Sequence, residues 1–244
     1  MLGGMGGWLT GALLGFDLET TGVDRFEDVP VSFSLVSVVE GIVVRSWSGL
    51  VDPDRPVPPE ATAVHGITTE RARAEGMPLA AAIALLTDAI VAAGRRGVPL
   101  VGMRLDFDLT MVETQAARLC GRGLVERGWS GPVLDAAVLD RHLDPMREGR
   151  RTLVDLCAHY GVAMERPHDA TADAVASVEV LFAMATRHDV LRRGGLRRLH
   201  AAQVGWHRAW VAEYDAGRRE RCQVPIDPRD FLWPLAPAVL PPAA

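Results

Sequence analysis

The sequence predicts an α/β protein with a five-stranded mixed sheet, in which the first three strands are antiparallel and helices cover the faces. Two observations support this class. The N-terminal part holds three stretches rich in β-branched residues joined by short links, and the remainder alternates short buried strands with stretches of helical periodicity. A meander followed by strand–helix units is typical of a mixed sheet flanked by helices. A C-terminal helical extension is expected beyond this sheet.

The three strands of the meander are predicted from apolar runs. Residues 9–18 form a mostly apolar stretch that reads as a buried strand, and residues 29–39 and 41–51 are rich in β-branched residues. Glu40 and Gly41 lie between the second and third runs and predict a tight turn. The Pro-rich stretch 51–61 fits neither the strand nor the helix period, so we expect a loop there.

The strand–helix part is predicted from periodicity and from residues that stop helices. Short buried strands are expected near 98–103 and at the start of 131–143. Helices are expected over residues 78–94, 108–119, the second half of 131–143, 151–161, 171–188 and about 196–216. Pro78 opens the first of these helices, and Gly94 and Gly161 end two of them.

Composition excludes several classes of protein. The net charge of −5 gives no general attraction to nucleic acid or to an anionic membrane. Its three cysteines, Cys120, Cys157 and Cys222, form no CxxC pair, so neither a disulfide framework nor a zinc site is expected, and a reducing cytoplasm suits the chain. No apolar run reaches membrane-spanning length. Residues 1–16 lack the basic start of a cleaved leader, so we expect none.

Acidic residues follow predicted strands or open predicted helices at four places. Asp17 and Glu19 end the first strand, and because side chains alternate they point to the same face. The other places hold Asp106 and Asp108, Asp135, and Asp173 with His168 five residues before it. Each acid alone could equally be a helix cap or a partner of the helix dipole. Together they predict an oxygen-rich pocket suited to Mg²⁺ or Mn²⁺.

Four motifs occur in a specific order along the chain: FDLETTG at 16–22, HGIT at 65–68, LDFDLTMV at 105–112 and HDATADA at 168–174. In order and rough spacing they resemble the DEDDh 3′–5′ exonucleases, a family that includes the proofreading epsilon subunit of bacterial DNA polymerase III, oligoribonuclease and ribonuclease T. The resemblance implies a ribonuclease H-like exonuclease fold over residues 9–187. Residues 188–244 would then form an Arg-rich helix and a Pro-rich tail.

The resemblance also implies a reaction and its residues. Two ions, Mg²⁺ or Mn²⁺, would be held by Asp17, Glu19, Asp108 and Asp173. His168 would be the general base, since an unperturbed imidazole, with a pKa of about 6.5, can accept a proton near neutral pH. The related subfamily has a Tyr four residues before the last Asp, and neither Tyr160 nor Tyr214 precedes an Asp at that spacing. The substrate would be the 3′ end of single-stranded DNA or RNA, hydrolysed to nucleoside monophosphates.

Substrate contacts are implied by the same motifs. The expected set is Leu18, Thr20, Thr21, Gly22, His65, Gly66, Ile67 and Arg104. Leu18 and Ile67 would pack on the terminal nucleotide from two sides, and residues 20–22 would offer backbone N–H groups to the 3′ end. For His65 a plain loop histidine remains the alternative.

The second acidic motif departs from the family pattern. Arg104 stands where the family usually has Asn, so it could contact a phosphate or turn outward. Asp106 is the rival of Asp108 as a metal ligand. We favour Asp108 because Phe107 precedes it, as in the family, and because the helical register continues from it.

Other functions remain open on the sequence alone. The chain could be a catalytically impaired nucleic-acid-binding module on the same scaffold, or another ribonuclease H-like nuclease such as an endonuclease. It could act alone or with a DNA polymerase or another replication or repair protein, and no membrane partner is expected. Trp206 and Trp210 predict helix packing in preference to base stacking. Nine Arg over residues 185–221 predict a solvated face, with phosphate contacts as the alternative.

Overall fold

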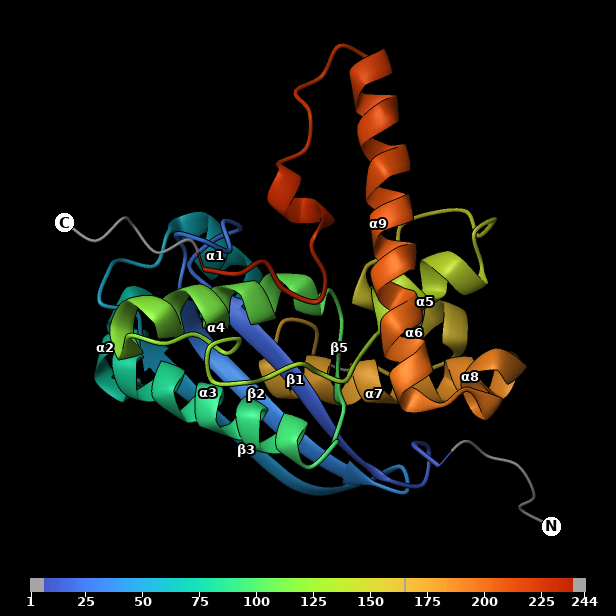
Figure 1. Ribbon diagram of the computed structural model, residues 1–244. Helices are drawn as coiled ribbons and strands as arrows, with labels where there is room; N and C mark the ends of the chain where they lie inside the picture. Colours follow the sequence, from blue (N-terminus) through green and yellow to red (C-terminus); the bar gives the residue numbers. More distant parts are fainter. Residues whose placement is uncertain (1–6, 165, 239–244) are drawn as a thin grey trace.

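The computed structural model describes residues 7–164 and 166–238 and contains a six-stranded mixed sheet with the strand order β4-β3-β2-β1-β5-β6 (Figure 1). The predictions for the extreme N-terminus and for the last six residues of the tail lie outside the described residues. The strands are β1 (Ala12–Thr20), β2 (Pro30–Val39), β3 (Ile42–Asp52), β4 (Met77–Pro78), β5 (Leu100–Gly102) and β6 (Val133–Asp135).

Strand pairing confirms the predicted α/β class and its antiparallel start. β1 pairs with β2 and β2 with β3 in antiparallel register, while β5 joins β1 and β6 joins β5 in parallel. Glu40 and Gly41 both have positive φ in the β2–β3 turn, as a tight hairpin requires. The additional strand, β4, pairs with the end of β3 through two residues, which is too short to leave a periodic pattern in the sequence.

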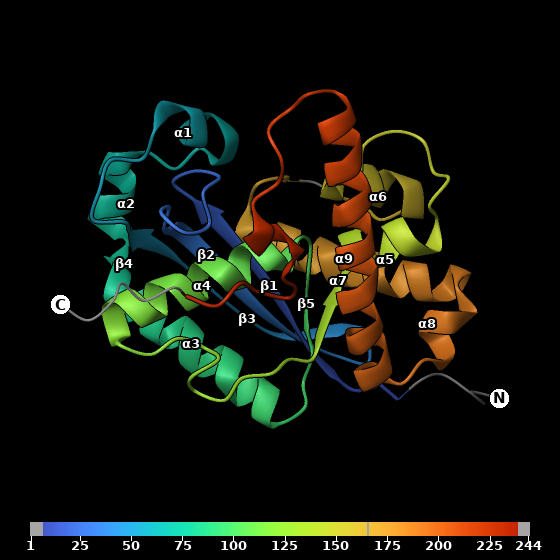
Figure 2. The ribbon, with the colours of Figure 1, turned by 45° about the horizontal axis from the view of Figure 1, so that its top comes forward.

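Helices cover both faces of the sheet, as predicted (Figures 1 and 2). They are α1 (Pro59–His65), α2 (Thr69–Glu75), α3 (Leu79–Arg95), α4 (Leu105–Cys120), α5 (Ala136–Leu143), α6 (Leu153–Tyr160), α7 (Ala170–Arg187), α8 (Asp189–Arg193) and α9 (Leu196–Glu220), with a 3₁₀ turn, η1, at Pro228–Phe231. The sequence did not indicate α1, which begins inside the predicted loop. Proline is tolerated in a first helical turn, where its missing N–H is not needed.

The alternation of β1 separates apolar from acidic side chains. Leu14, Phe16 and Leu18 face α3 and α4 and belong to the larger apolar core. The opposite face packs on α7, and it is the face that carries Asp17 and Glu19. Gly15 allows this packing, because a Cβ there would lie 3.1 Å from the carbonyl oxygen of Ala174 in α7. The close approach brings the start of α7 to the acidic end of β1.

The C-terminal residues are packed on the body of the protein. Gln203 of α9 is fully buried and satisfies the outer edge of β6: its Oε1 accepts from the Asp135 N–H, and its Nε2 donates to the Val133 carbonyl. The tail then crosses α4 (Figure 1), where Trp233 and Leu235 join the larger core. Within the described residues, no helix is long and apolar enough to cross a membrane.

Candidate active site

Three elements bring acidic side chains to one end of the sheet. Glu19 comes from β1, Asp108 from the first turn of α4 and Asp173 from the first turn of α7, and each is less than a tenth exposed. Single ligand atoms from Glu19, His168 and Asp173 all lie within 4.8 Å of one another. Asp17 belongs to the same end of the sheet, because it precedes Glu19 by two residues on the same face of β1, and the carboxylates of Asp108 and Asp173 raise its pKa. The predicted acids therefore gather in one place.

Burial and mutual repulsion raise the pKa of all four carboxyl groups. Burial raises the pKa of Asp17 well above its ordinary value, and the carboxylates of Asp108 and Asp173 add to this. Burial, followed by Asp173, raises the pKa of Glu19 to about 7. Burial raises the pKa of Asp173 to about 6, and it also raises that of Asp108, with further contributions from Asp106 and Asp135. A cation among the four groups would favour their ionised forms.

The donor set fits a hard divalent cation. Oδ1 of Asp173 is buried and has no hydrogen-bond partner among the described residues, although a buried carboxylate oxygen normally has one. The clustered acids offer carboxylate oxygens, which Mg²⁺ and Mn²⁺ prefer. A cation among Asp17, Glu19 and Asp173 would satisfy the orphaned oxygen and relieve the repulsion.

His168 lies at the rim of this cluster. Its side chain is exposed, and its backbone takes a left-handed conformation with φ 65°. The His168 N–H donates to Oδ2 of Asp173 at 3.3 Å, which holds the residue beside the acids. Asp169 follows as the N-cap of α7 and accepts from the N–H groups of Thr171 and Ala172. An exposed imidazole beside clustered carboxylates can exchange protons with both water and the site.

The rival acids Asp106 and Asp108 have different partners. Asp106 forms a buried ion pair with Arg25, whose Nη1 lies 3.0 Å from its Oδ2. The carboxylate of Asp108 forms no hydrogen bond or ion pair with any residue that the structure describes, and Glu19 lies near enough to raise its pKa. This arrangement favours Asp108 as the ligand, as the sequence analysis did.

Asp135, at the fourth acidic place, is a structural residue. It is fully buried, and its two carboxylate oxygens accept from four backbone N–H groups: those of Arg104 and Leu105 at the start of α4, and those of Ala137 and Val138 at the start of α5. One side chain thus caps two helices, one of which carries Asp108. The sequence indicated an acid at a strand end but not this second helix.

Arg104 occupies an unusual backbone position at the start of α4. It has φ 59°, its side chain is exposed, and its N–H donates to Asp135 at 3.2 Å. Its guanidinium lowers the pKa of Asp108, although burial raises that pKa more. Arg104 therefore turns outward yet stays close to the acidic site, where it could meet a phosphate.

The loop after β1 only partly matches the expectation for substrate contacts. The Thr21 N–H donates to the Val29 carbonyl at 2.9 Å, so the prediction that it is free to bind a 3′ end is wrong for this structure. Gly22 has a steric role, since a Cβ there would lie 2.5 Å from Oδ2 of Asp28. Asp28 in turn accepts from the Thr21 hydroxyl and from the Asp24 N–H, which fixes the loop. Thr20 directs its hydroxyl to the Gly22 carbonyl.

His65 and Ile67 line a hollow next to the acids. The Ile67 N–H donates to Nδ1 of His65, so Nε2 carries the proton and points to the Thr20 carbonyl at 3.2 Å. Gly66 between them has φ 72° and ends α1. The hollow measures about 280 Å³ and extends from His65 and Ile67 to His168. Leu18 packs in the larger core in this structure.

Several lining residues of this hollow were not found from the sequence. Phe33 and Ser48 come from β2 and β3, and Arg71 comes from α2. They belong to different elements and share no motif with His65 or His168. The register of β2 against β1, with Leu18 opposite Phe33, could have suggested Phe33 alone.

A mixed sheet with clustered carboxylates at the end of its central strand defines the ribonuclease H-like nuclease class. The exonuclease family model named RNase_T matches residues 14–181. The chain therefore belongs to this exonuclease family, the DEDDh group, and carries a nuclease domain of a metal-dependent kind.

Relatives of known name agree with this assignment. The chain is 31% identical over 175 residues to a DNA polymerase III subunit epsilon-like protein of Rhodobacter capsulatus. This match covers 67% of this chain and 22% of the relative. It is 29% identical over 170 residues to a PolC-type DNA polymerase III of Latilactobacillus sakei, covering 68% of this chain and 11% of the relative. The chain thus matches about a fifth or less of the length of these relatives.

Solved structures share the fold. A crystal structure of E. coli exonuclease I in complex with a dA16 oligonucleotide superposes with a TM-score of 0.63 at 22% identity, covering 81% of this chain and 44% of that chain. Another exonuclease I structure gives the same TM-score at 23% identity, covering 74% of this chain and 42% of that chain. At this identity the likeness supports the fold.

Proposed function

We propose that this protein is a metal-dependent 3′–5′ exonuclease that removes nucleoside monophosphates from the 3′ ends of single-stranded DNA or RNA. The observation that carries the proposal is the cluster of Glu19, His168 and Asp173, with ligand atoms within 4.8 Å of one another, beside Asp17 and Asp108. A fold gains no stability from such repulsion, so a cationic ligand and a reaction are the natural reasons for it.

The relatives support the substrate class. Exonuclease I has been crystallised with a dA16 oligonucleotide, and the sequence relatives are named as an epsilon-like protein of DNA polymerase III and as a PolC-type DNA polymerase III. By analogy, the substrate here would be a single strand, and a DNA polymerase or another replication or repair protein would be a partner. Residues 14–181 carry the family match, so we propose residues 9–187 as the catalytic domain and residues 188–244 as an extension.

The site residues divide into ligands, base and substrate contacts. Asp17, Glu19, Asp108 and Asp173 would hold two Mg²⁺ or Mn²⁺ ions, which polarise the phosphate and stabilise the leaving oxygen when bound. His168 would take the proton from the attacking water, since its exposed imidazole can pass that proton on to solvent. The hollow beside His65 and Ile67 would receive the terminal nucleotide, with Arg104 near a phosphate.

The test is a cleavage assay on 5′-labelled oligonucleotides in Mg²⁺ or Mn²⁺. We expect a ladder that shortens from the 3′ end, absent in Asp17→Asn and present in the control Asp88→Asn, which removes a carboxylate 68% exposed on the surface. Matched DNA and RNA oligomers compare the two substrates. A missing ladder, a ladder unchanged by Asp17→Asn, or cleavage of circular single strands would contradict the proposal.

Binding without turnover is the second candidate function, and the position of Arg104 beside Asp108 favours it. The guanidinium could replace part of the cation charge at this ligand. If the protein binds a 3′ end in Mn²⁺ without cleaving it, and Arg104→Asn gains turnover, the result would support a binding function over the exonuclease function.

A further inference from the structure

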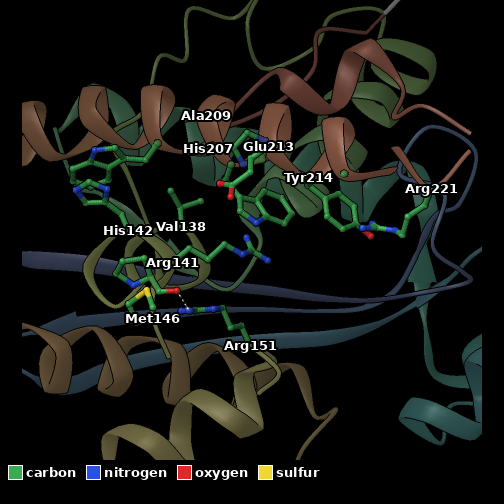
Figure 3. Close-up of a pocket in the computed structure, with 14 residues that line it drawn as sticks. Val138, Arg141, His142, Met146, Arg151, His207, Ala209, Glu213, Tyr214 and Arg221 are labelled. Atoms are coloured by element: carbon green, nitrogen blue, oxygen red, sulfur yellow. Dashed lines mark hydrogen bonds between the residues drawn. The ribbon is translucent and has the colours of Figure 1, made fainter. Parts of the chain in front are cut away.

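A second concave site lies between α5, the loop that follows it, and α9 (Figure 3). We call it the α5–α9 groove. Its volume is about 640 Å³, larger than that of the hollow at the acids. Tyr214 and Arg221 reach into the groove from α9, and Arg141, Met146 and Arg151 reach in from the opposite side (Figure 3). None of these side chains has a role in the proposed reaction.

An aromatic stripe forms the α9 wall of this groove. Trp206, Trp210 and Tyr214 are spaced by four residues and therefore share one face of the helix. The rings of Trp210 and Tyr214 are nearly parallel, 11° apart, with centroids 5.6 Å from each other. His142 stacks on Trp206 at 3.7 Å. Trp206 packs on the body of the protein, as its sequence pattern predicted, while Trp210 and Tyr214 remain accessible from the groove.

Positive charge is concentrated in the same groove. The Arg141 guanidinium lies 3.8 Å from the centre of the Trp210 ring. Neither Arg141 nor Arg221 forms an ion pair with any residue that the structure describes. Among the described residues that line the groove, Glu213 is the one acid. The groove thus offers two guanidinium groups without a direct ion pair, beside flat aromatic faces.

The third arginine of the groove, Arg151, has a structural role. Arg151 donates to the carboxylate of Asp140, which is fully buried and also accepts from Arg147 and from the Tyr160 hydroxyl. These bonds fix the loop after α5, so one wall of the groove is preformed. A ligand binds a preformed site with a smaller loss of conformational entropy than it binds a flexible site.

The groove adjoins the acidic site, because α5, which lines the groove, begins directly after Asp135, whose carboxylate also accepts from the N–H groups of Arg104 and Leu105 at the start of α4. Burial lowers the pKa of Arg141, and among its charged neighbours Asp135 raises it while Arg104 lowers it further. Arg104 also acts on Asp108, as described above. The basic groups therefore continue from the carboxylates through Arg104 and Arg141 to Trp210. This continuity argues for one ligand that extends from the acids to the groove.

We propose that the α5–α9 groove binds the nucleotides of a single strand that precede its 3′-terminal residue, with bases stacked on Trp210 and Tyr214 and phosphates paired with Arg141 and Arg221. Aromatic faces with arginine are how many proteins bind single strands without sequence preference. The stripe from residue 206 to residue 221 spans about 22 Å, at the rise of an α-helix, which is long enough for several nucleotides. The α9 wall lies outside the residues that match the exonuclease family model.

This inference rests on the proposed function for the polarity of the strand, but binding can be measured without cleavage. The experiment measures fluorescence anisotropy of 5′-fluorescein-labelled oligothymidylates of about three and about sixteen nucleotides in EDTA, so that no metal supports hydrolysis. The variants are Arg141→Gln, Trp210→Leu and Arg221→Gln. The matched control is Arg208→Gln, which removes an exposed arginine two positions from Trp206 on the same helix. Arg221 is exposed as well, so its replacement leaves folding intact.

The expected result depends on oligomer length. Each groove variant should weaken binding of the long oligomer by about tenfold, in line with the loss of one stacked base or one paired phosphate. Binding of the short oligomer and its rate of cleavage in Mg²⁺ should stay unchanged, because it fills only the acidic site. Arg208→Gln should behave as the wild type with both lengths.

Other outcomes separate this inference from the proposed function. If the wild type cleaves nothing but the groove variants still lose affinity for the long oligomer, the nuclease proposal is wrong and the proposal that the groove binds single strands is supported. If cleavage is normal and the groove variants bind the long oligomer like the wild type, the inference is overturned. It is also overturned if polyglutamate of equal charge displaces the oligomer from the wild type as well as unlabelled oligothymidylate does, since the groove would then fit an acidic polypeptide.

Discussion

Arg25 and Asp106 form a buried ion pair that joins the loop after β1 to the first turn of α4. Nη1 of Arg25 lies 3.0 Å from Oδ2 of Asp106, and the two side chains are only 8% and 12% exposed. Arg25 also donates to Asp230 in η1, so the same guanidinium ties the C-terminal tail to this corner. Asp108, two positions further along α4, has no such partner and lies beside the other acids.

This pairing predicts opposite effects for two Asp→Asn substitutions in one helical turn. Asp106→Asn should lower the free energy of unfolding by about 1–3 kcal/mol, because a buried guanidinium loses a charged acceptor but keeps Asp230. Turnover of the folded fraction should persist. Asp108→Asn should abolish turnover and leave the unfolding free energy equal or higher, since it removes a repelled carboxylate. Urea unfolding and cleavage rates measure both effects, and equal loss of activity in the two variants would make Asp106 a ligand.

Asp135 provides a second contrast, between a cap and a ligand. Asp135→Ala would leave four N–H groups at two helix starts without their acceptor, so we expect a loss of about 2–4 kcal/mol of stability. Thr152→Ala at the capping box of α6 is the matched control, with an expected loss of about 1 kcal/mol. Thermal unfolding measures both. A loss for Asp135→Ala no larger than the control would show that the double cap contributes little.

Gly22→Ala tests whether the loop after β1 needs glycine for steric reasons. The added Cβ would lie 2.5 Å from Oδ2 of Asp28, which also accepts from the Asp24 N–H. We expect reduced stability and a raised KM, because the loop must move. The double variant Gly22→Ala with Asp28→Ala should recover part of the KM change by removing the clash. If the KM of the double variant does not recover, Gly22 is needed because the substrate approaches its backbone closely, and the clash with Asp28 is not the cause.

Local rules were enough to predict much of this fold. Side-chain alternation placed Asp17 and Glu19 on one face of β1, and glycine after α6 marked its end at Gly161. Strand β1 begins three residues later and ends two residues later than predicted, because its last pairs with β2 depend on the partner strand. Helix α1 was missed because the prolines of residues 51–61 suggested only a loop, and no element was predicted for the residues of α2.

Partners far apart in the sequence were not predictable by the same rules. Arg25 and Asp106 are 81 positions apart, and Arg141 and Trp210 are brought together only when α9 packs beside α5. No periodic pattern in the sequence indicates such pairings. The sequence motifs located the acids, since several residues of fixed type recur in order, but the double cap at Asp135 and the α5–α9 groove required the packed structure.

The raised pKa values predict that metal-free protein loses stability as pH rises. The pKa of Glu19 goes from an ordinary value near 4.5 to about 7 in the folded state, and that of Asp173 from near 3.8 to about 6. The folded state therefore binds more protons than the unfolded state between about pH 4 and pH 7, and stability falls through that window. Melting temperatures in EDTA should decline from about pH 4 to pH 7.

Divalent metal should remove this decline. Mg²⁺ binds the ionised carboxylates of the folded state, so the melting temperature should rise with added Mg²⁺, most of all near pH 7. Glu19→Gln should flatten the profile in EDTA and reduce the Mg²⁺ effect, whereas Asp88→Asn should change neither. Identical pH profiles with and without Mg²⁺ would show that no cation binds at these acids.

The last prediction separates the imidazole of His168 from its backbone. The residue has φ 65°, a left-handed conformation that Asn adopts more readily than most residues, so His168→Asn preserves the loop and the N–H donated to Asp173. We expect kcat to fall by about 10²–10⁴, the usual contribution of a general base, with an unchanged melting temperature and unchanged stabilisation by Mg²⁺. His188→Asn at the N-cap of α8 is the matched control and should keep full turnover. If His168→Asn retains most of the wild-type kcat, the proton of the attacking water leaves by another route and the base assignment is wrong.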